Sequence, residues 1–278
     1  MTILEGHRLV IDTISNDKTR SLYKDVLVTW DALNHPQLGE KLSSRLQMLV
    51  DEGQCNVRLA ADNVMKAACD TVTPQGVVAV VDIPPPYEGQ TEIERETSSK
   101  DHTFFIVFDG ISDPGNVGTL LRSAFSVGAD AIIALPNTCD LWSPKAIRSA
   151  MGTSFQVPVR SVQSWDECLT FMESCGVTND KIYAATMEGS EKANGAELVY
   201  ESKPHDNIHW TDHSSALILG REGTGLTSEI RKAVAEGQIR SVHVPMEPGI
   251  ESLNAAVCGS VIMFEYHRQC RAFNSSEK

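Results

Sequence analysis

Apolar and polar positions divide the chain into two parts with clear secondary-structure patterns, separated near residue 90. In the first part, four leucines recur at helical spacing on one face of a helix predicted over residues 37–50: Leu38, Leu42, Leu46 and Leu49. The same criteria predict a helix at residues 4–14 and short strands at residues 26–28, 57–60 and 77–81. This alternation predicts a small α/β domain over residues 1–82.

The part after residue 101 alternates more strongly between strands and helices. A continuous apolar run at residues 104–108 is typical of a strand that is covered on both faces. Further strands are predicted at residues 131–135, 182–185, 216–219 and 242–244, and helices at residues 117–127, 143–151, 164–174, 227–236 and 252–270. This order predicts a mostly parallel sheet wrapped by helices over residues 102–278, with ligands bound at the carboxyl ends of its strands.

Residues 83–101 are interpreted as a linker between the two parts. Three consecutive prolines, Pro84 to Pro86, are followed by acidic and small polar residues. Prolines hold the backbone extended, and the other residues offer little surface to bury.

The composition, 41% hydrophobic and 22% charged, is that of an ordinary globular protein. No apolar run approaches the roughly 20 residues that span a bilayer, so no membrane segment is predicted. The first 25 residues hold four acids and four bases and no apolar core, which argues against a targeting segment. We therefore expect a cytoplasmic protein, or a mitochondrial or plastid one if a targeting segment was removed.

The seven cysteines are scattered along the chain without any C-x-x-C spacing. Their odd number and their scatter favour reduced thiols over a disulfide framework. Nothing matches the spacing of zinc ligands, so no metal site is predicted.

Three predicted strand ends are followed by loops rich in glycine and polar residues. In the first loop, residues 109–122, Asn116 lies at the predicted helix entrance and Arg122 well inside the helix. Taken alone, this loop also fits an ordinary strand–turn–helix in which Asn116 caps the helix.

The second loop, residues 219–226, has three glycines in six residues, which allows a backbone to approach a ligand closely. It lacks the Gly-Lys-Ser/Thr ending of a phosphate-binding loop and the glycine spacing of a dinucleotide-binding loop. Glu222 in this loop is either a turn acceptor or a functional carboxylate.

The third loop, residues 244–254, leads into the last helix, where Ser252 fits a cap. Asn254 faces an otherwise apolar run. A buried amide must be hydrogen-bonded, so Asn254 either anchors backbone or meets a ligand.

Together and in this order, the three loops resemble the three signature motifs of the SpoU/TrmH family of the SPOUT methyltransferase superfamily. The matching patterns are Asn-x-Gly-x-x-x-Arg, Gly-x-Glu-Gly-x-Gly, and Pro-Met followed by Ser-Leu-Asn: Asn116, Gly118, Arg122, Gly220 to Gly225, Pro245, Met246 and Ser252 to Asn254. The stretch from Lys145 to Ser154 is similar to the family's Arg-x-Ser-x-Gly segment. Each motif alone is weak, whereas three in register over residues 109–254 are specific.

The N-terminal part resembles the ribosomal-protein-like domain with which many family members bind their substrate. The match consists of Glu5-Gly6 opening a helix and Pro74-Gln75-Gly76 before the predicted strand at residues 77–81. In the family, a histidine commonly stands where this chain has Pro74.

The resemblance implies a deep trefoil knot, in which the last strand and helix thread through a loop. It also implies that the knotted loops bind S-adenosylmethionine in a bent form. The residues that correspond to cofactor contacts, or border them, are Gly220, Val244, Leu253, Thr186, Met187, Gly223 and Met246. Family members are homodimers whose active site takes residues from both subunits, so the implied partners are an RNA and a second copy of the chain.

The implied reaction is methyl transfer to a ribose 2′-hydroxyl of RNA. Arg122 either accepts or steers the hydroxyl proton or, because guanidinium keeps its proton, clamps an RNA phosphate and orients the ribose. Asn116, Glu222, Ser252 and Asn254 would complete a catalytic polar network. Arg122, Arg148 and Arg221 are the predicted RNA-binding residues.

Several alternatives are weighed against this interpretation. Ribosomal RNA is the first choice of substrate, because the two-domain layout is similar to that of rRNA enzymes, and tRNA is the second. A catalytically idle RNA-binding or ribosome-assembly factor of the same fold, and a Rossmann enzyme that binds a dinucleotide, are the others. The net charge of −13 argues against RNA binding, since phosphate contacts normally leave a basic footprint.

Overall fold

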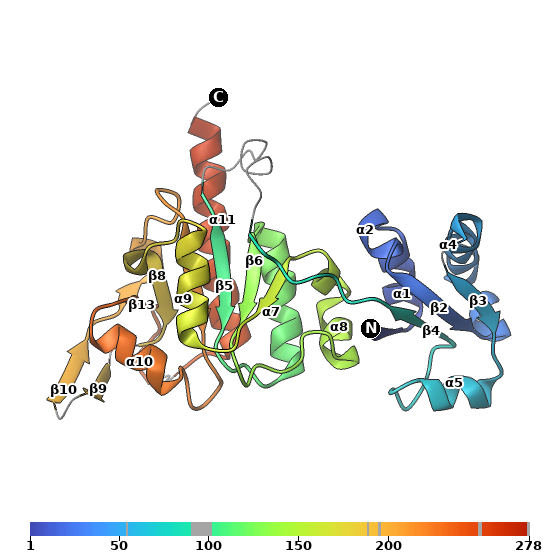
Figure 1. The fold of residues 1–278 in the computed structure, drawn as a ribbon, viewed down its shortest axis with the longest axis horizontal. Helices are drawn as coiled ribbons and strands as arrows, with labels where there is room; N and C mark the ends of the chain where they lie inside the picture. The colour runs from blue at the N-terminus through green and yellow to red at the C-terminus, as the bar shows by residue number, and fades with distance from the viewer. Residues whose placement is uncertain (54, 90–101, 188, 194–195, 250–251, 277–278) are drawn as a thin grey trace. The chain divides into compact units, whose positions relative to one another are not determined.

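The computed structural model describes residues 1–53, 55–89, 102–187, 189–193, 196–249 and 252–276 (Figure 1). The chain forms two compact units. The first unit comprises Met1–Pro85 and Asp140–Gln156, and the second comprises Pro86–Cys139 and Val157–Lys278. The predicted linker at residues 83–101 lies largely outside the described residues. Within the described part of the chain, no helix is long and apolar enough to cross a membrane.

The first unit is built on a four-stranded sheet in the order β1-β4-β2-β3. Its strands are β1 (Thr2–Glu5), β2 (Tyr23–Val28), β3 (Asn56–Leu59) and β4 (Val77–Val81). β4 runs antiparallel to both of its neighbours, and β2 pairs in parallel with β3. The prediction of an α/β layer is confirmed, although β1 occupies residues that the sequence pattern assigned to the start of a helix.

Five short helices accompany this sheet: α1 (His7–Ile14), α2 (Asp17–Arg20), α3 (Trp30–Leu33), α4 (Gly39–Glu52) and α5 (Asp62–Ala68). The leucine face predicted on α4 is confirmed, since Leu42, Leu46 and Leu49 are buried in the core of this unit. α8 (Pro144–Ala150) also belongs to this unit, because Ile147 packs into the same core. The sequence pattern had placed α8 in the C-terminal domain.

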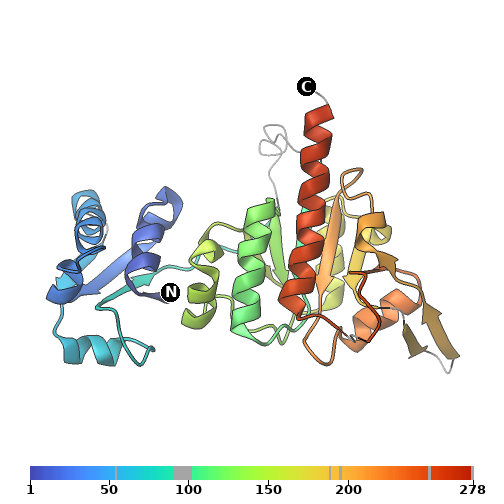
Figure 2. The same cartoon turned by 180° about the vertical axis from the view of Figure 1, so that it is seen from behind.

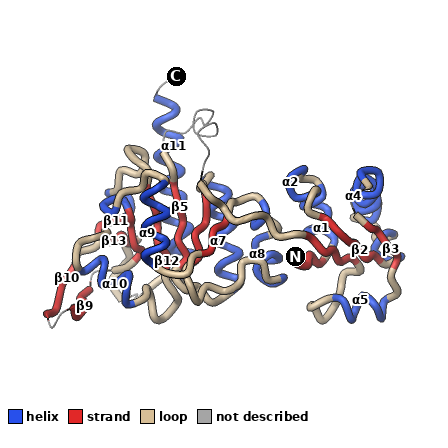
Figure 3. The backbone as a smooth tube through the Cα atoms, viewed as in Figure 1, coloured by secondary structure: helices blue, strands red, loops and turns tan. Residues whose placement is uncertain are grey.

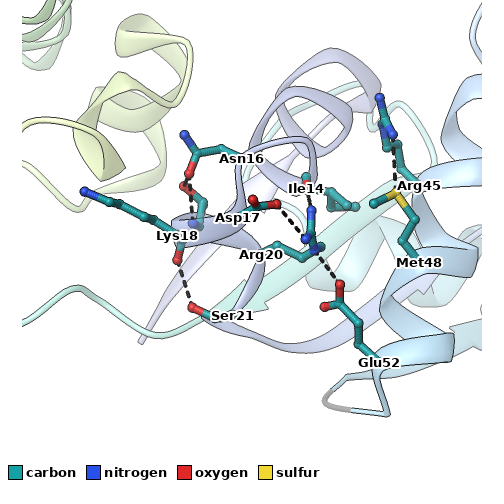
Figure 4. A network of polar contacts seen from close by, with 10 residues as sticks. Ile14, Asn16, Asp17, Lys18, Arg20, Ser21, Arg45, Met48 and Glu52 are labelled. Atoms are coloured by element: carbon teal, nitrogen blue, oxygen red, sulfur yellow. Dashed lines mark hydrogen bonds and ion pairs between the residues drawn. The ribbon is translucent and has the colours of Figure 1, made fainter.

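An arginine joins helices of the first unit on its surface (Figure 4). The Arg20 guanidinium lies 2.6 Å from the Asp17 carboxylate and 2.7 Å from that of Glu52, and it donates to the carbonyl of Ile14. These contacts connect the end of α2 to the ends of α1 and α4. Surface ion pairs of this kind each contribute about 0–1 kcal/mol, so burial of the leucines dominates stability here.

The second unit is built on a seven-stranded sheet in the order β11-β13-β8-β12-β5-β6-β7, in which every pair is parallel. Its strands are β5 (Phe104–Phe108), β6 (Ala131–Ala134), β7 (Val159–Ser161), β8 (Ile182–Ala185), β11 (Lys203–Pro204), β12 (Ser215–Leu219) and β13 (Arg240–His243). The predicted parallel sheet is confirmed. The sequence pattern missed β7 and β11, which are only two or three residues long, and the antiparallel pair β9 (Gly189–Ala193) and β10 (Ala196–Tyr200).

Helices cover both faces of this sheet, as Figures 2 and 3 show. They are α7 (Pro114–Val127), α9 (Trp165–Ser174), α10 (Ser228–Ala235) and α11 (Ala255–Ser276). Along β5, Phe105 packs with Phe171 of α9, whereas the neighbouring Phe104 stacks at 3.9 Å on Tyr266 of α11. Because successive strand residues point to opposite faces, the all-apolar run at residues 104–108 follows directly from this two-sided cover. The knot implied by the resemblance stays a prediction.

Candidate active site

The carboxyl ends of three neighbouring strands, β13, β8 and β12, surround a cavity of about 270 Å³ together with the start of α11. Since these strands are parallel and adjacent, their following loops meet at one edge of the sheet. All seven residues predicted to contact a cofactor line this cavity: Gly220, Val244, Leu253, Thr186, Met187, Gly223 and Met246. Glu222, Ser252 and Arg221 line it as well.

Several lining residues were not predicted from the sequence: Ala185, Leu219, Gly225, Val242, His243, Ala255 and Cys258. Most of them end a strand or neighbour a predicted residue, which is a usable signal. Cys258 follows Asn254 by one helical turn, so helical spacing would have found it. Burial raises the pKa of the Cys258 thiol, which keeps it protonated near neutral pH.

The glycine-rich loop after β12 folds back on itself as a tight bridge. The backbone groups of Arg221 and Gly225 exchange two hydrogen bonds of 3.0 Å. Gly220 must be a glycine, because a Cβ there would lie 2.7 Å from the carbonyl carbon of Gly225. This bridge holds Glu222 at the tip of the loop beside the cavity.

A buried carboxylate supports the same loop from β5. Asp109 is 1% exposed and accepts a hydrogen bond of 2.6 Å from the backbone N–H of Thr227, where the loop ends. Burial raises the pKa of Asp109, although the Thr227 hydrogen bonds and the nearby Arg221 guanidinium act in the opposite direction. The side chain of Arg221 lies against Gly110, since a Cβ on Gly110 would be 2.8 Å from its Nε.

Asn254 joins the three predicted loops through one side-chain amide. Its Nδ2 donates to the Asn116 side-chain oxygen at 3.2 Å and to the carboxylate of Glu222. Its Oδ1 accepts from the backbone N–H groups of Ala256 and Val257, at 2.9 and 3.1 Å. Asn254 is therefore both the cap of α11 and the bridge between the first and second loops.

Two expectations about helix caps are corrected by these contacts. Ser252 does not cap the last helix, because the cap is Asn254 and α11 begins at Ala255. Asn116 does not cap α7, because Asp113 occupies that position and accepts from the Asn116 backbone N–H at 2.9 Å. The Asn116 side chain is thereby left to contact Asn254. Asn254 itself is exposed, whereas its apolar sequence context suggested burial.

The predicted arginines lie in different surroundings. Arg122 is exposed on α7, and its guanidinium makes no hydrogen bond or ion pair with any described residue. Arg148 belongs to the first unit, where it pairs with the Glu5 carboxylate at 3.1 Å and lies 3.8 Å from that of Asp70. The structure thus brings Asn116, Glu222 and Asn254 into contact and leaves Arg122 outside their hydrogen-bond network.

No group of three or more metal-ligating side chains occurs among the described residues. The mixture of glycine backbone, apolar side chains and a few polar groups around the cavity is typical of a small-molecule site.

Comparison with protein families matches residues 103–264 to the SpoU rRNA Methylase family. Among curated proteins, the chain is 26% identical over 291 residues to the mitochondrial rRNA methyltransferase 3A of Danio rerio, covering 96% of this chain and 63% of that protein. It is 29% identical over 266 residues to the 23S rRNA (guanosine(2553)-2′-O)-methyltransferase of Bacillus subtilis (strain 168), covering 94% and 86%. The chain therefore spans less than two thirds of the Danio rerio relative.

Solved structures with the same fold include the SpoU methyltransferase AviRb from Streptomyces viridochromogenes in complex with AdoMet. It has a TM-score of 0.71 and 22% sequence identity and covers 97% of this chain and 90% of that one. The AdoMet-bound rRNA methyltransferase from Sinorhizobium meliloti has a TM-score of 0.69 and 22% identity, covering 96% and 87%.

Proposed function

The chain belongs to the SpoU rRNA Methylase family, and we propose that it transfers a methyl group from S-adenosylmethionine to a ribose 2′-hydroxyl of RNA. The observation that carries the proposal is the contact of Asn254 with Asn116 and Glu222. It assembles three motifs, from residues 116, 222 and 254, beside one cavity. The named activities of the Danio rerio and Bacillus subtilis relatives support the same reaction.

The cavity fits a cofactor of this kind. Its volume of about 270 Å³ lies just below the roughly 300–1,000 Å³ usual for small-molecule sites. Gly220 and Gly223 present backbone at its edge, and Val244, Met246 and Leu253 offer apolar contact. Two structures of similar fold are described as bound to AdoMet.

S-adenosylmethionine would supply an electrophilic methyl group to the ribose 2′-hydroxyl, which would leave a 2′-O-methyl ribose, S-adenosylhomocysteine and a released proton. The protein's contribution is to position the ribose and to handle the hydroxyl proton. Glu222, fixed by Asn254, places a carboxylate beside the cavity as the group that orients this hydroxyl. We assign Arg122 to the RNA phosphate next to the reacting ribose, because its guanidinium is exposed, uncommitted and permanently charged.

Ribosomal RNA is the substrate class that we propose, since the relatives in both mitochondria and bacteria are named as rRNA enzymes. Arg221 at the cavity is assigned a contact to this RNA. Arg148 is assigned one only if RNA displaces its ion pair with Glu5. The Danio rerio relative is named as mitochondrial and the other relative is bacterial, so we propose a mitochondrial or a cytoplasmic location.

A second copy of this chain is the proposed protein partner. One surface of α11 carries three half-exposed apolar side chains: Val257, Val261 and Phe264, with exposures between 38% and 50%. Those on α11 are spaced i, i+4 and i+7, so they lie on one face of the helix. Contiguous apolar patches on a protein surface commonly mark protein–protein contacts. Val261→Glu should shift the chain to a monomer in sedimentation analysis.

Methyl transfer itself is tested by incubating the purified chain with methyl-labelled S-adenosylmethionine and total RNA, followed by mapping of ribose methylation. Label in rRNA ribose supports the proposal, and label in tRNA ribose would mean that tRNA, and not rRNA, is the substrate. Binding of RNA without transfer would favour an idle assembly factor. Calorimetry with a nicotinamide dinucleotide tests the alternative of a Rossmann enzyme. Absence of dinucleotide binding would count against that alternative.

A further inference from the structure

The first unit contains a second cavity, of about 660 Å³, that the proposed reaction does not use. It lies where the loop before β4 meets the starts of α1 and α3. Its lining includes His7, Asp31, His35, Lys66 and Gln75. The two sequence features that matched the substrate-binding domain, at Gly6 and at Gln75-Gly76, come together here.

Backbone geometry fixes the Gln75 side chain in this cavity. Its Oε1 accepts a hydrogen bond of 3.0 Å from the His7 backbone N–H, the first free donor of α1. Gly6, with φ of 101°, leaves the space that this amide occupies, since a Cβ there would lie 2.7 Å from Oε1. The amide is thereby oriented beside the His7 side chain, with which it is also hydrogen-bonded, and its nitrogen carries two N–H donors.

The two histidines are also oriented, and each offers one definite group. The His35 Nδ1 accepts from the backbone N–H groups of Gln37 and Leu38, both at 3.3 Å, so its proton lies on Nε2. The His7 Nε2 lies 3.2 Å from the Ala32 carbonyl and donates to it, which leaves Nδ1 as an acceptor. Burial lowers the pKa of His7, so this ring is neutral near pH 7.

The lining therefore combines donors, of which those of Gln75 and His35 are held by hydrogen bonds, with exposed carboxylate acceptors and an apolar floor. Gln75 Nε2, His35 Nε2 and the Lys66 ammonium donate, and the carboxylates of Asp31 and Asp62 accept. Met65 is 2% exposed and forms part of the floor. A nucleobase has this same combination, with donors and acceptors on its edges and apolar faces.

Other ligand classes fit the cavity less well. Two carboxylates against one ammonium disfavour a phosphate, and no cluster of metal-ligating side chains occurs among the described residues. Residues 1–82 carry eleven acids and eight bases, so broad phosphate binding is not available to this unit.

We infer that this cavity binds one unpaired nucleobase of the RNA, with Gln75, His35 and Asp31 as the groups that contact its edge. The inference rests on the proposed function to the extent that it assumes an RNA substrate. It assigns the first unit a way to bind RNA through a base, which an acidic chain can do without a basic surface. Because Asp31 and Asp62 accept hydrogen bonds, we expect a preference for guanine, which presents two adjacent donor groups, N1–H and the N2 amino group, on its pairing edge.

The test uses the full chain and two short single-stranded RNAs that differ only at the centre, where one has guanine and the other is abasic. The wild-type chain should bind the guanine RNA about 10-fold more tightly, as fluorescence anisotropy would measure. Gln75→Ala should remove this difference. Gln47→Ala, a glutamine exposed on α4 of the same unit, is the matched control and should keep it.

Asp31→Asn provides a second variant, because Asp31 is exposed and its replacement leaves the Gln75–His7 hydrogen bond in place. It should reduce the preference for guanine even if Gln75→Ala fails to fold. Equal binding of the two RNAs, or a difference that persists in both variants, would overturn the inference. Loss of the difference between the two RNAs when inorganic phosphate alone is added would overturn the inference as well, because the cavity would then bind phosphate.

The outcome is distinguishable from that of the methyl-transfer assay. Base-dependent binding without any methyl transfer would support this site and count against the proposed function. Methyl transfer without base-dependent binding would support the proposed function and count against the base site in the first unit.

Discussion

The two cavities of this chain are built in different ways. In the second unit, loops after three separate strands are tied together by one side chain, Asn254, which contacts Asn116 and Glu222. In the first unit, backbone turns at Gly6 and Gly76 hold a single amide, that of Gln75, over the start of α1. A site made by side chains leaves specific residues in the sequence, whereas a site made by backbone leaves mainly glycines.

The largest expected effect separates RNA positioning from cofactor binding in the second unit. Arg122→Ala should lower methyl transfer about 100-fold or more, because a charged donor on the RNA phosphate is lost. Binding of S-adenosylmethionine should not change, since Arg122 does not line the cavity. Single-turnover transfer and calorimetry measure the two quantities. Arg58→Ala, an exposed arginine of the first unit, is the control, and full activity of Arg122→Ala would remove this residue from the mechanism.

A smaller effect separates the two roles of Asn254. Asn254→Asp keeps an oxygen for the backbone N–H groups of Ala256 and Val257, so α11 stays capped. The new carboxylate cannot donate to Asn116 and repels Glu222, so methyl transfer should fall about 10-fold. Asn254→Ala should add a loss of stability of about 1 kcal/mol.

Thermal unfolding and turnover of both variants separate these roles. If Asn254→Asp were fully active, the contact between the loops would have no catalytic importance, and the contrast between the two cavities would lose its basis.

The same contrast explains what the sequence could predict. The seven cofactor residues were predicted from the resemblance of the loops to the SpoU/TrmH motifs, and all of them line one cavity. Only the resemblance implied that the two asparagines share a polar network, because an asparagine near a helix start also fits a cap, whether or not Asp113 already fills that position. Residue patterns alone could not decide between a helix cap and a contact between loops.

The fold followed a similar rule. The run at residues 104–108 predicted a buried strand because both of its faces are apolar. β7 and β11 were missed, since they span only three and two residues and carry no periodicity of their own. α8 was assigned to the wrong unit because Ile147 and Arg148 meet residues that are distant in sequence, as the Arg148–Glu5 pair shows.

A glycine variant in the first unit sharpens the difference between backbone-built and side-chain-built sites. Gly76 has φ of 81°, and a Cβ there would collide with the Thr29 hydroxyl, so Gly76→Ala should cost about 1–3 kcal/mol. Gly53→Ala is the matched control, because Gly53 also has a positive φ of 68° but has no atom near its would-be Cβ. Denaturant unfolding should show a clearly larger loss for Gly76→Ala. Equal losses would mean that the cavity does not depend on this close approach.

The smallest expected effect concerns the carboxylate under the Glu222 loop. The pKa of Asp109 is raised mainly by burial, so the folded chain binds its proton more tightly than the unfolded chain does. Between the ordinary pKa near 4 and the raised value, the folded state therefore holds more protons, and this group's contribution to stability falls as the pH rises. Asp109→Asn keeps an oxygen for the Thr227 N–H and removes the titration. The variant should thus be more stable relative to wild type at pH 7 than at pH 4.

Denaturant unfolding at the two pH values measures this difference. A variant that loses more stability at pH 7 than at pH 4 would mean that the Arg221 guanidinium, and not burial, dominates at Asp109. The loop that carries Glu222 would then be held by an ion pair between side chains. If burial dominates, as predicted, the loop that carries Glu222 is held instead by the hydrogen bond between Asp109 and the Thr227 backbone. The active-site cavity would then depend in part on backbone contacts, as the cavity around Gln75 does.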